Sequence, residues 1–147
     1  MKAAFEILLP EPPAPRGGYV PAVKAGNLLF VSGMLPIEKG AVAVTGKVGG
    51  NVSIDEGRNA ARLAVLNALA VVDKYGGGFE NVRRIVKVTG YVNSAPGFTS
   101  QPQVVDGASE LLVKLFGEEG RHARAAVGVA ELPADAAVEI EMICEVG

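Results

Sequence analysis

The chain has 147 residues, 49% hydrophobic and 20% charged, with a formal net charge of −2 at pH 7; this length predicts one domain. The absence of a basic stripe argues against binding to nucleic acid, and the single cysteine excludes a disulfide framework and a cysteine-based zinc site. No apolar run is long enough to span a membrane and no signal-peptide pattern is seen, so we expect a cytoplasmic protein whose excess apolar surface lies in a subunit interface.

The first third of the chain predicts an arm followed by a β-hairpin. Residues 2–9 could form a short strand, and the three prolines and two glycines of residues 11–18 predict a loop, so that residues 1–18 form an N-terminal arm. Residues 19–23 and 28–32 are short apolar runs on either side of a Lys-Ala-Gly-Asn turn, which is typical of a hairpin. The Gly- and Val-rich residues 40–51 predict a loop that could contain a strand.

Two helices are predicted next. Ser53 and Glu56 have the spacing of a capping box, and apolar residues then recur at helical spacing as far as residue 75, where three glycines follow. A second helix is predicted over residues 100–116, with serine at its start as a cap, proline in its first turn and glycine after its end. Each helix has a single apolar face, so we expect each to pack on a sheet.

Three further strands are predicted over residues 85–92, 125–132 and 137–146. The Pro-Ala-Asp turn between the last two indicates a second hairpin. The expected order is hairpin, helix, strand, helix, hairpin, in a single domain over residues 1–147. This order favours an α+β fold with a mixed sheet and both helices on one face. The apolar composition suggests that another subunit covers the other face.

Alternation along the last two strands suggests where the charged residues point. Large apolar residues occupy every second position from 138 to 146, so Glu139 and Glu141 should point away from the helices. The same reasoning assigns Val127 and Val129 to the helix face and Arg124 to the open face. An arginine, an acid and small residues between them would form a pocket for a carboxylate. The alternative is an ion pair between strands on a solvated face.

Two stretches resemble a known family. Residues 123–141 contain Ala-Arg-Ala, Val-Gly-Val, Leu-Pro and Val-Glu-Ile-Glu, and the N-terminal part contains Gly-Tyr-Val at 18–20 and Ser-Gly-Met-Leu-Pro at 32–36. From about residue 18 to residue 146 the chain resembles the reactive-intermediate deaminases (RidA, also called YjgF-like). The resemblance implies a chorismate-mutase-like fold and a homotrimer whose sheets form an inner barrel, with a cleft at each subunit interface. The implied reaction is hydrolysis of enamines and imines, such as 2-aminoacrylate and 2-iminopropanoate, to 2-keto acids and ammonia, with no cofactor and no metal.

The resemblance also implies roles for individual residues. Arg124 would bind the substrate carboxylate, Glu139 would position or activate water, and Tyr19 would lie in the cleft. The backbone carbonyl of Ala126 would hold the substrate nitrogen. Ser32 is a further candidate for substrate binding, although its hydroxyl could equally bond only to the backbone.

Several positions depart from the family pattern. Val20 stands in place of serine, Met34 in place of glutamine and His122 in place of proline or alanine, while residues 93–103 form a longer segment without a counterpart of the family's cleft asparagine. These differences indicate a divergent subgroup. Two other functions stay open, namely a non-catalytic trimer that binds small carboxylates and a ribonuclease or translation inhibitor; the acidic charge weighs against the second. We interpret His122 as a solvated loop residue and Cys144 as an inert core thiol.

Overall fold

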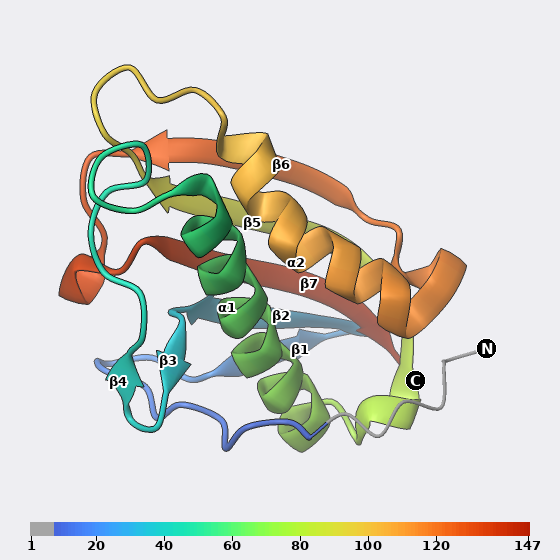
Figure 1. Cartoon of the computed structure of the whole chain (residues 1–147). Helices are drawn as coiled ribbons and strands as arrows, with labels where there is room; N and C mark the ends of the chain where they lie inside the picture. Colours follow the sequence, from blue (N-terminus) through green and yellow to red (C-terminus); the bar gives the residue numbers. More distant parts are fainter. Residues whose placement is uncertain (1–7) are drawn as a thin grey trace.

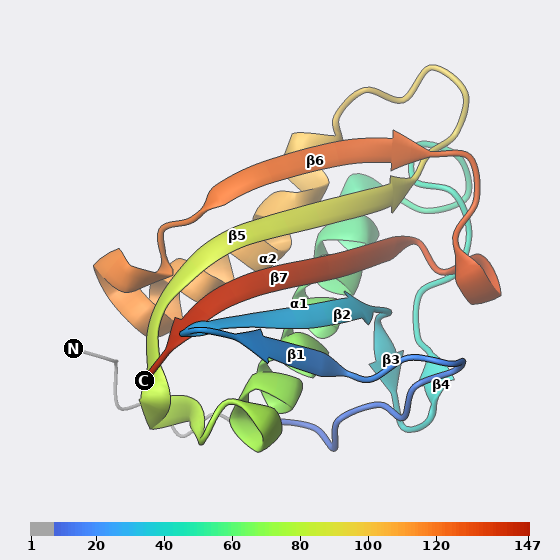
Figure 2. The same ribbon diagram turned by 180° about the vertical axis from the view of Figure 1, so that it is seen from behind.

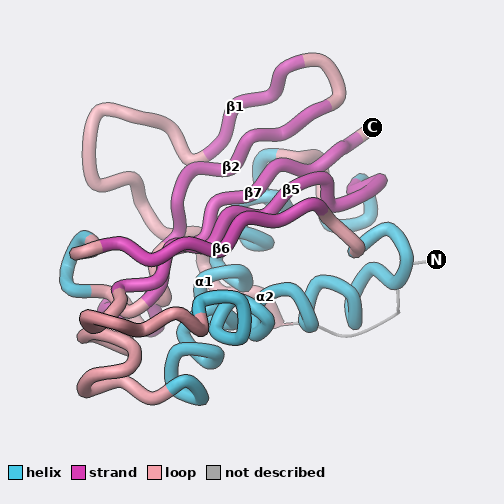
Figure 3. The backbone as a smooth tube through the Cα atoms, turned by 90° about the horizontal axis from the view of Figure 1, so that it is seen from above, coloured by secondary structure: helices cyan, strands magenta, loops and turns pink. Residues whose placement is uncertain are grey.

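The computed structural model describes residues 8–147 and shows two helices packed on one face of a five-stranded sheet (Figure 1). Within the described residues nothing covers the opposite face of the sheet (Figure 2), and sheet and helices form two layers (Figure 3). The elements are β1 Ala22–Ala25, β2 Leu28–Met34, β3 Ile37–Glu38, β4 Ala41–Val42, α1 Ile54–Tyr75, η1 Phe79–Asn81, β5 Val82–Asn93, α2 Gln101–Phe116, η2 Gly117–Gly120, β6 Ala123–Val129, η3 Pro133–Asp135 and β7 Val138–Val146.

The N-terminal half contains the β-hairpin that the sequence predicts. Strands β1 and β2 pair antiparallel around the expected turn, and β3 and β4 form a small separate hairpin that begins before the segment predicted as a loop. The strand expected over residues 2–9 lies outside the described residues except at Leu8 and Leu9, which are not in a strand.

The cap predicted for α1 is confirmed. The Ser53 hydroxyl accepts a hydrogen bond from the Glu56 amide, and the Glu56 carboxylate accepts one from the Ser53 amide, each at 3.0 Å. The hydrogen bond from the Ser53 amide, with a smaller effect of the Ser53 side chain, lowers the pKa of Glu56, because it stabilises the charged carboxylate. The corresponding cap at Ser100 is not formed, since that residue has φ −95° and ψ 33° rather than the extended backbone of a capping residue.

The predicted hairpin between the last two strands is wrong. The sheet order is β1-β2-β7-β5-β6, so β7 lies antiparallel between β2 and β5, while β6 is an edge strand parallel to β5. Helix α2 connects β5 to β6 and carries the chain back to the end where β5 began, and such a crossover produces parallel pairing. The segment after β6, including η3, then carries the chain past β5 to reach the centre of the sheet.

The core lies between the sheet and the helices. The alternation predicted for β7 is confirmed, because every second residue from Val138 to Val146 is buried. Cys144 belongs to this buried set, and burial raises the pKa of its thiol to about 11, which fits an inert core residue. None of the helices within residues 8–147 combines the length and apolar character needed to cross a membrane.

A glycine brings α2 close to the sheet. A Cβ built at Gly90, in the middle of β5, would overlap the side chain of Val105 on α2. Only a residue without a side chain therefore lets α2 approach this closely. This approach sets α2 beside β5 and the neighbouring edge strand β6, which is where the candidate arginine lies.

Candidate functional site

The structure places Arg124 on the helix face of the sheet, so the predicted open-face orientation was wrong. The parallel register aligns Arg124 with Val88, which is fully buried beneath the helices, and aligned residues of neighbouring strands point to the same face. The Arg124 Nη1 donates hydrogen bonds to Asp106 Oδ1 at 2.7 Å and to Ser109 Oγ at 3.1 Å, both on α2. The arginine is therefore held by a helix and does not share a face with the glutamates.

The orientation predicted for Arg124 was wrong because the valines of β6 were assigned to the helix face. Val127 is 42% exposed and points to the uncovered face, while the small residues Ala126 and Gly128 face α2. Small residues on the helix face leave room for the helix, and an edge strand can leave valines exposed because only one side of it is paired. The role expected for the Ala126 carbonyl stays a prediction.

His122 is part of the same network rather than a solvated loop residue. Its Nδ1 lies 2.7 Å from the carbonyl oxygen of Gly120, and its Nε2 lies 2.9 Å from Ser109 Oγ. Because a carbonyl only accepts, Nδ1 carries the proton and the neutral ring accepts the Ser109 proton at Nε2. Burial and the charge of Arg124 lower the pKa of His122, against the smaller opposing effect of the Gly120 hydrogen bond, and so favour this neutral form.

A shallow hollow opens beside these residues. It has a volume of about 250 Å³ and is lined by Ser109, Val113, Arg121, His122 and Arg124. Val113 makes one wall apolar, while Arg121 and Arg124 supply hydrogen-bond donors, which suits a small anionic ligand. The hollow was not predicted, because Ser109 shows only as one more residue of an amphipathic helix in the sequence.

Glu139 lies on the uncovered face, as alternation predicted. Its carboxylate sits against the backbone of Gly33 on β2, and a Cβ built there would overlap it. Partial burial, and the negative charge of Glu141 nearby, raise the pKa of Glu139. A half-buried carboxylate whose pKa lies above its ordinary value is a better candidate for a general base than a solvated one.

Tyr91 is a neighbour that the sequence analysis missed. It pairs with Glu139 across β5 and β7, and its hydroxyl donates a hydrogen bond to the Glu141 carboxylate. This bond, with smaller effects of burial and of the charges of both glutamates, raises the pKa of Tyr91 to about 12. Its position on the open face follows from alternation along β5, but the importance of that position depends on the pairing with β7.

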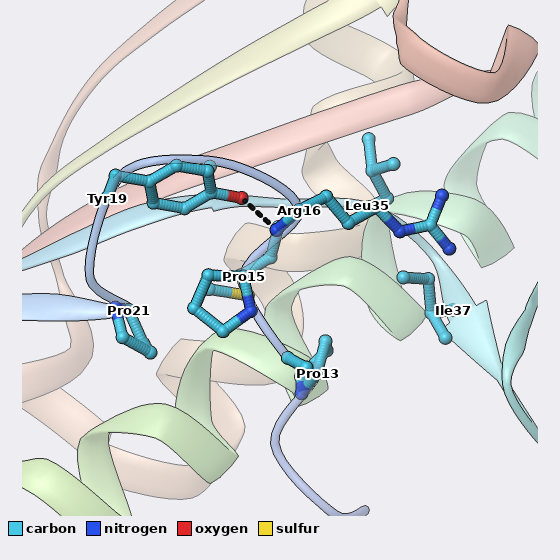
Figure 4. Close-up of a pocket in the computed structure, with 10 residues that line it drawn as sticks. Pro13, Pro15, Arg16, Tyr19, Pro21, Leu35 and Ile37 are labelled. Carbon is cyan, nitrogen blue, oxygen red and sulfur yellow. Dashed lines mark hydrogen bonds between the residues drawn. The ribbon is translucent and has the colours of Figure 1, made fainter.

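Tyr19 and Ser32 lie near Gly33 at the N-terminal end of the site. The Tyr19 hydroxyl accepts a hydrogen bond from the Arg16 amide at 3.3 Å, and the Arg16 side chain runs toward Leu35 (Figure 4). The side chain of Tyr19 is 50% exposed and lines a small cavity of about 40 Å³ together with the prolines of the arm. The Ser32 hydroxyl donates to the carbonyl oxygen of Val20 at 2.7 Å, which is the backbone bond expected as its alternative role.

The predicted site residues thus form two groups within one chain. Tyr19, Ser32 and Glu139 gather around Gly33, whereas Arg124 and Ala126 lie on the helix face of the edge strand, with β5 between β6 and β7. In residues 8–147 no three side chains of His, Cys, Asp or Glu are grouped as metal ligands would be.

Comparison with known proteins identifies the family. The model described as "YjgF/chorismate mutase-like, putative endoribonuclease" matches residues 2–146. Protein TCP17 of Trypanosoma cruzi is 44% identical over 140 residues, which cover 95% of this chain and 88% of that protein. A 2-iminobutanoate/2-iminopropanoate deaminase of Dermatophagoides farinae is 34% identical over 138 residues, covering 93% of this chain and 92% of the relative.

The fold agrees with a solved structure. The crystal structure of "a putative endoribonuclease" from Shewanella oneidensis is 32% identical in sequence, and the match covers 95% of this chain and 93% of that chain with a TM-score of 0.92. The mixed sheet with two helices on one face is therefore the expected α+β, chorismate-mutase-like fold. The chain belongs to the YjgF/chorismate-mutase-like family.

Proposed function

We propose that this protein hydrolyses enamine and imine intermediates to 2-keto acids and ammonia, in a site assembled between copies of the chain. The observation that carries the proposal is Glu139, a half-buried carboxylate of raised pKa on a sheet face that the described residues leave uncovered. A relative that is 34% identical is named as a deaminase of such imines, and this supports the same reaction here.

The separation of the two groups of residues supports assembly from more than one copy. Arg124 and Glu139 point to opposite faces of one sheet, so a single chain does not bring them to the same ligand. The open face also exposes apolar side chains, with Val23, Phe30 and Val127 between 41% and 54% exposed. Apolar surface of this kind favours self-association, in agreement with the homotrimer that the family resemblance implies.

In the proposed reaction, Arg124 binds the substrate and Glu139 acts on the water molecule. Arg124 binds the carboxylate of the imine through two parallel N–H···O bonds, which fixes the orientation of the imine carbon. Glu139 takes a proton from a water molecule as the water oxygen bonds to that carbon. The nitrogen takes up this proton and a second proton from the new hydroxyl group, the C–N bond breaks, ammonia leaves and a carbonyl forms, so that imine and water become keto acid and ammonia.

Release of keto acid from an imine that an amino-acid oxidase generates in the assay tests this function. We expect Arg124→Ala and Glu139→Gln to remove the acceleration, with the exposed Arg62→Ala on α1 as a matched control that retains it. Turnover by Arg124→Ala equal to that of the unmodified protein would contradict the proposal.

One observation favours a second candidate, a carboxylate-binding protein without turnover. The Ser32 hydroxyl donates its proton to a backbone carbonyl, and the buried Met34 has a thioether, which carries no proton, so neither offers a donor to a substrate. Stabilisation by 2-keto acids in a thermal-shift measurement, without ammonia release from imines, would support this candidate over the deaminase.

A further inference from the structure

We propose that Asp106 and Ser109 position the Arg124 guanidinium and make its site selective for a singly charged carboxylate over a doubly charged anion. The inference rests on the proposed function, because it specifies the ligand class of the same arginine. None of the bonds that hold Arg124 was expected from the sequence.

One helix holds the guanidinium. The Nη1 group donates to Asp106 Oδ1 at 2.7 Å and to Ser109 Oγ at 3.1 Å, and Nη2 lies 3.4 Å from the carbonyl oxygen of Pro102. Pro102, Asp106 and Ser109 are four and three residues apart, so they lie along one face of α2. Because a guanidinium is planar, fixing Nη1 in two bonds fixes the plane of the whole group.

These bonds leave one edge for a ligand. Within residues 8–147 the Nε–H of Arg124 has no hydrogen-bond acceptor, and it points in the same direction as one N–H of Nη2. Two parallel N–H groups are the arrangement that binds both oxygens of a carboxylate. The side chain is 22% exposed, and it lines the hollow together with Ser109 and His122, so the guanidinium is not sealed from a ligand.

His122 sets the direction of the Ser109 hydroxyl. The neutral ring accepts the Ser109 proton at Nε2, while the Gly120 carbonyl fixes the other nitrogen. The oxygen lone pairs of Ser109 are then available to Arg124. His122 is thus a positioning residue one bond further from the ligand.

Asp106 provides the selectivity. Its carboxylate neutralises the charge of Arg124, so the binding free energy of a ligand depends more on its two hydrogen bonds than on its net charge. The second charge of a doubly charged anion is attracted by Arg124 and repelled by Asp106, so it adds little to binding. Arg121, which also lines the hollow, has a carboxylate partner of its own in Glu118 at 3.7 Å. The hollow of about 250 Å³ beside Arg124, with Val113 as its apolar wall, has room for a small organic acid.

Calorimetric titration of the full chain at alkaline pH, where inorganic phosphate is doubly charged, compares the binding of phosphate with that of 2-oxobutanoate and so tests the proposal. We expect Asp106→Asn to shift the ratio of the two affinities toward phosphate by roughly tenfold, because the repulsion of the second charge is lost. Ser109→Ala should weaken 2-oxobutanoate binding several-fold, and Ser109→Thr, which keeps the hydroxyl, should restore it. Urea unfolding of each variant separates these effects from a loss of folding.

The outcomes separate this inference from the proposed function. If Arg124→Ala binds 2-oxobutanoate as the unmodified protein does, Arg124 does not bind the carboxylate, and its role in the proposed function is contradicted. If Arg124→Ala abolishes binding but Asp106→Asn leaves the affinity ratio unchanged, the selectivity proposal is overturned and the carboxylate site stands.

A measurement without ligand tests the positioning directly. Rotation of the Arg124 guanidinium about its Nε–Cζ bond, followed by nitrogen NMR, should be slow in the unmodified protein and faster in Asp106→Asn and Ser109→Ala. The imidazole signals of His122, the single histidine of the chain, should show the proton on Nδ1. Equal rotation in all three proteins would overturn the positioning role, whether or not a carboxylate binds.

Discussion

Strands β6 and β7 hold the two charged residues of the candidate site in different surroundings. Strand β7 lies between two other strands, its residues alternate strictly between buried and half-buried, and Glu139 points to the uncovered face. Strand β6 is at the edge, shows no such alternation, and turns Arg124 toward α2. For a central strand, alternation in the sequence is thus enough to predict which side chains point to which face. For an edge strand, the positions of the neighbouring elements must also be known.

The variants with the largest expected effect test whether Arg124 and Glu139 act in one site. Arg124→Ala and Glu139→Gln should each reduce imine hydrolysis by at least roughly 100-fold, because each removes a group that acts on the substrate. Unfolding both proteins together and refolding them as mixed assemblies should restore activity. With random mixing, about one site in four would receive Arg124 from one copy and Glu139 from another.

Native mass spectrometry should confirm that mixed assemblies have formed. Activity that stays at the level of the single variants after confirmed mixing would mean that the two residues do not serve the same site.

A smaller effect is expected from the contact that brings α2 to the sheet. Gly90→Ala places a Cβ against Val105 and should lower the free energy of unfolding by about 1–3 kcal/mol, measured by urea denaturation. It should also weaken carboxylate binding, because α2 carries the partners of Arg124. Gly128→Ala is the matched control on β6, since the added Cβ meets mainly the ends of side chains. Equal losses in both variants would contradict the special role of Gly90.

Tyr91 provides a test of how its surroundings affect the Glu139 carboxylate. Tyr91→Phe removes the hydrogen bond that disperses the charge of Glu141, so the pKa of Glu139 should rise further. The acidic limb of the pH–activity profile should then move up by roughly a few tenths of a pH unit, with little change in KM. Tyr75→Phe, at an exposed tyrosine on α1, is the control, and a profile that matches it would oppose this account.

The smallest expected effect concerns stability. The raised pKa of Glu139 means that the folded chain binds a proton more readily than the unfolded chain does, so this group lowers stability as the pH rises from 4.5 through the raised value. Glu139→Gln should therefore give a slightly higher unfolding midpoint at pH 7 than the unmodified protein, and no gain at pH 4. Glu145→Gln, on the same face of β7, is the comparison for loss of charge alone.

Much of the fold follows from local chemistry in the sequence. The Ser53–Glu56 box and the apolar stripes of both helices depend only on residues within a few turns, and α1 and α2 lie where they predict. The family signatures in residues 18–36 and 123–141 likewise predicted the fold class. For β7, alternation was enough to place Glu139 on the open face.

The tertiary structure alone decided which strands are neighbours. The parallel pairing of β6 with β5 depends on the path of α2 and of the segment after β6, and that pairing turns Arg124 toward Asp106, Ser109 and His122. Contacts between residues far apart in the chain leave no fixed spacing in the sequence, so alternation within β6 could not reveal them. Local sequence is enough to assign the charged residues, the helices and most of the strands, whereas packing between distant segments brings particular charged groups together.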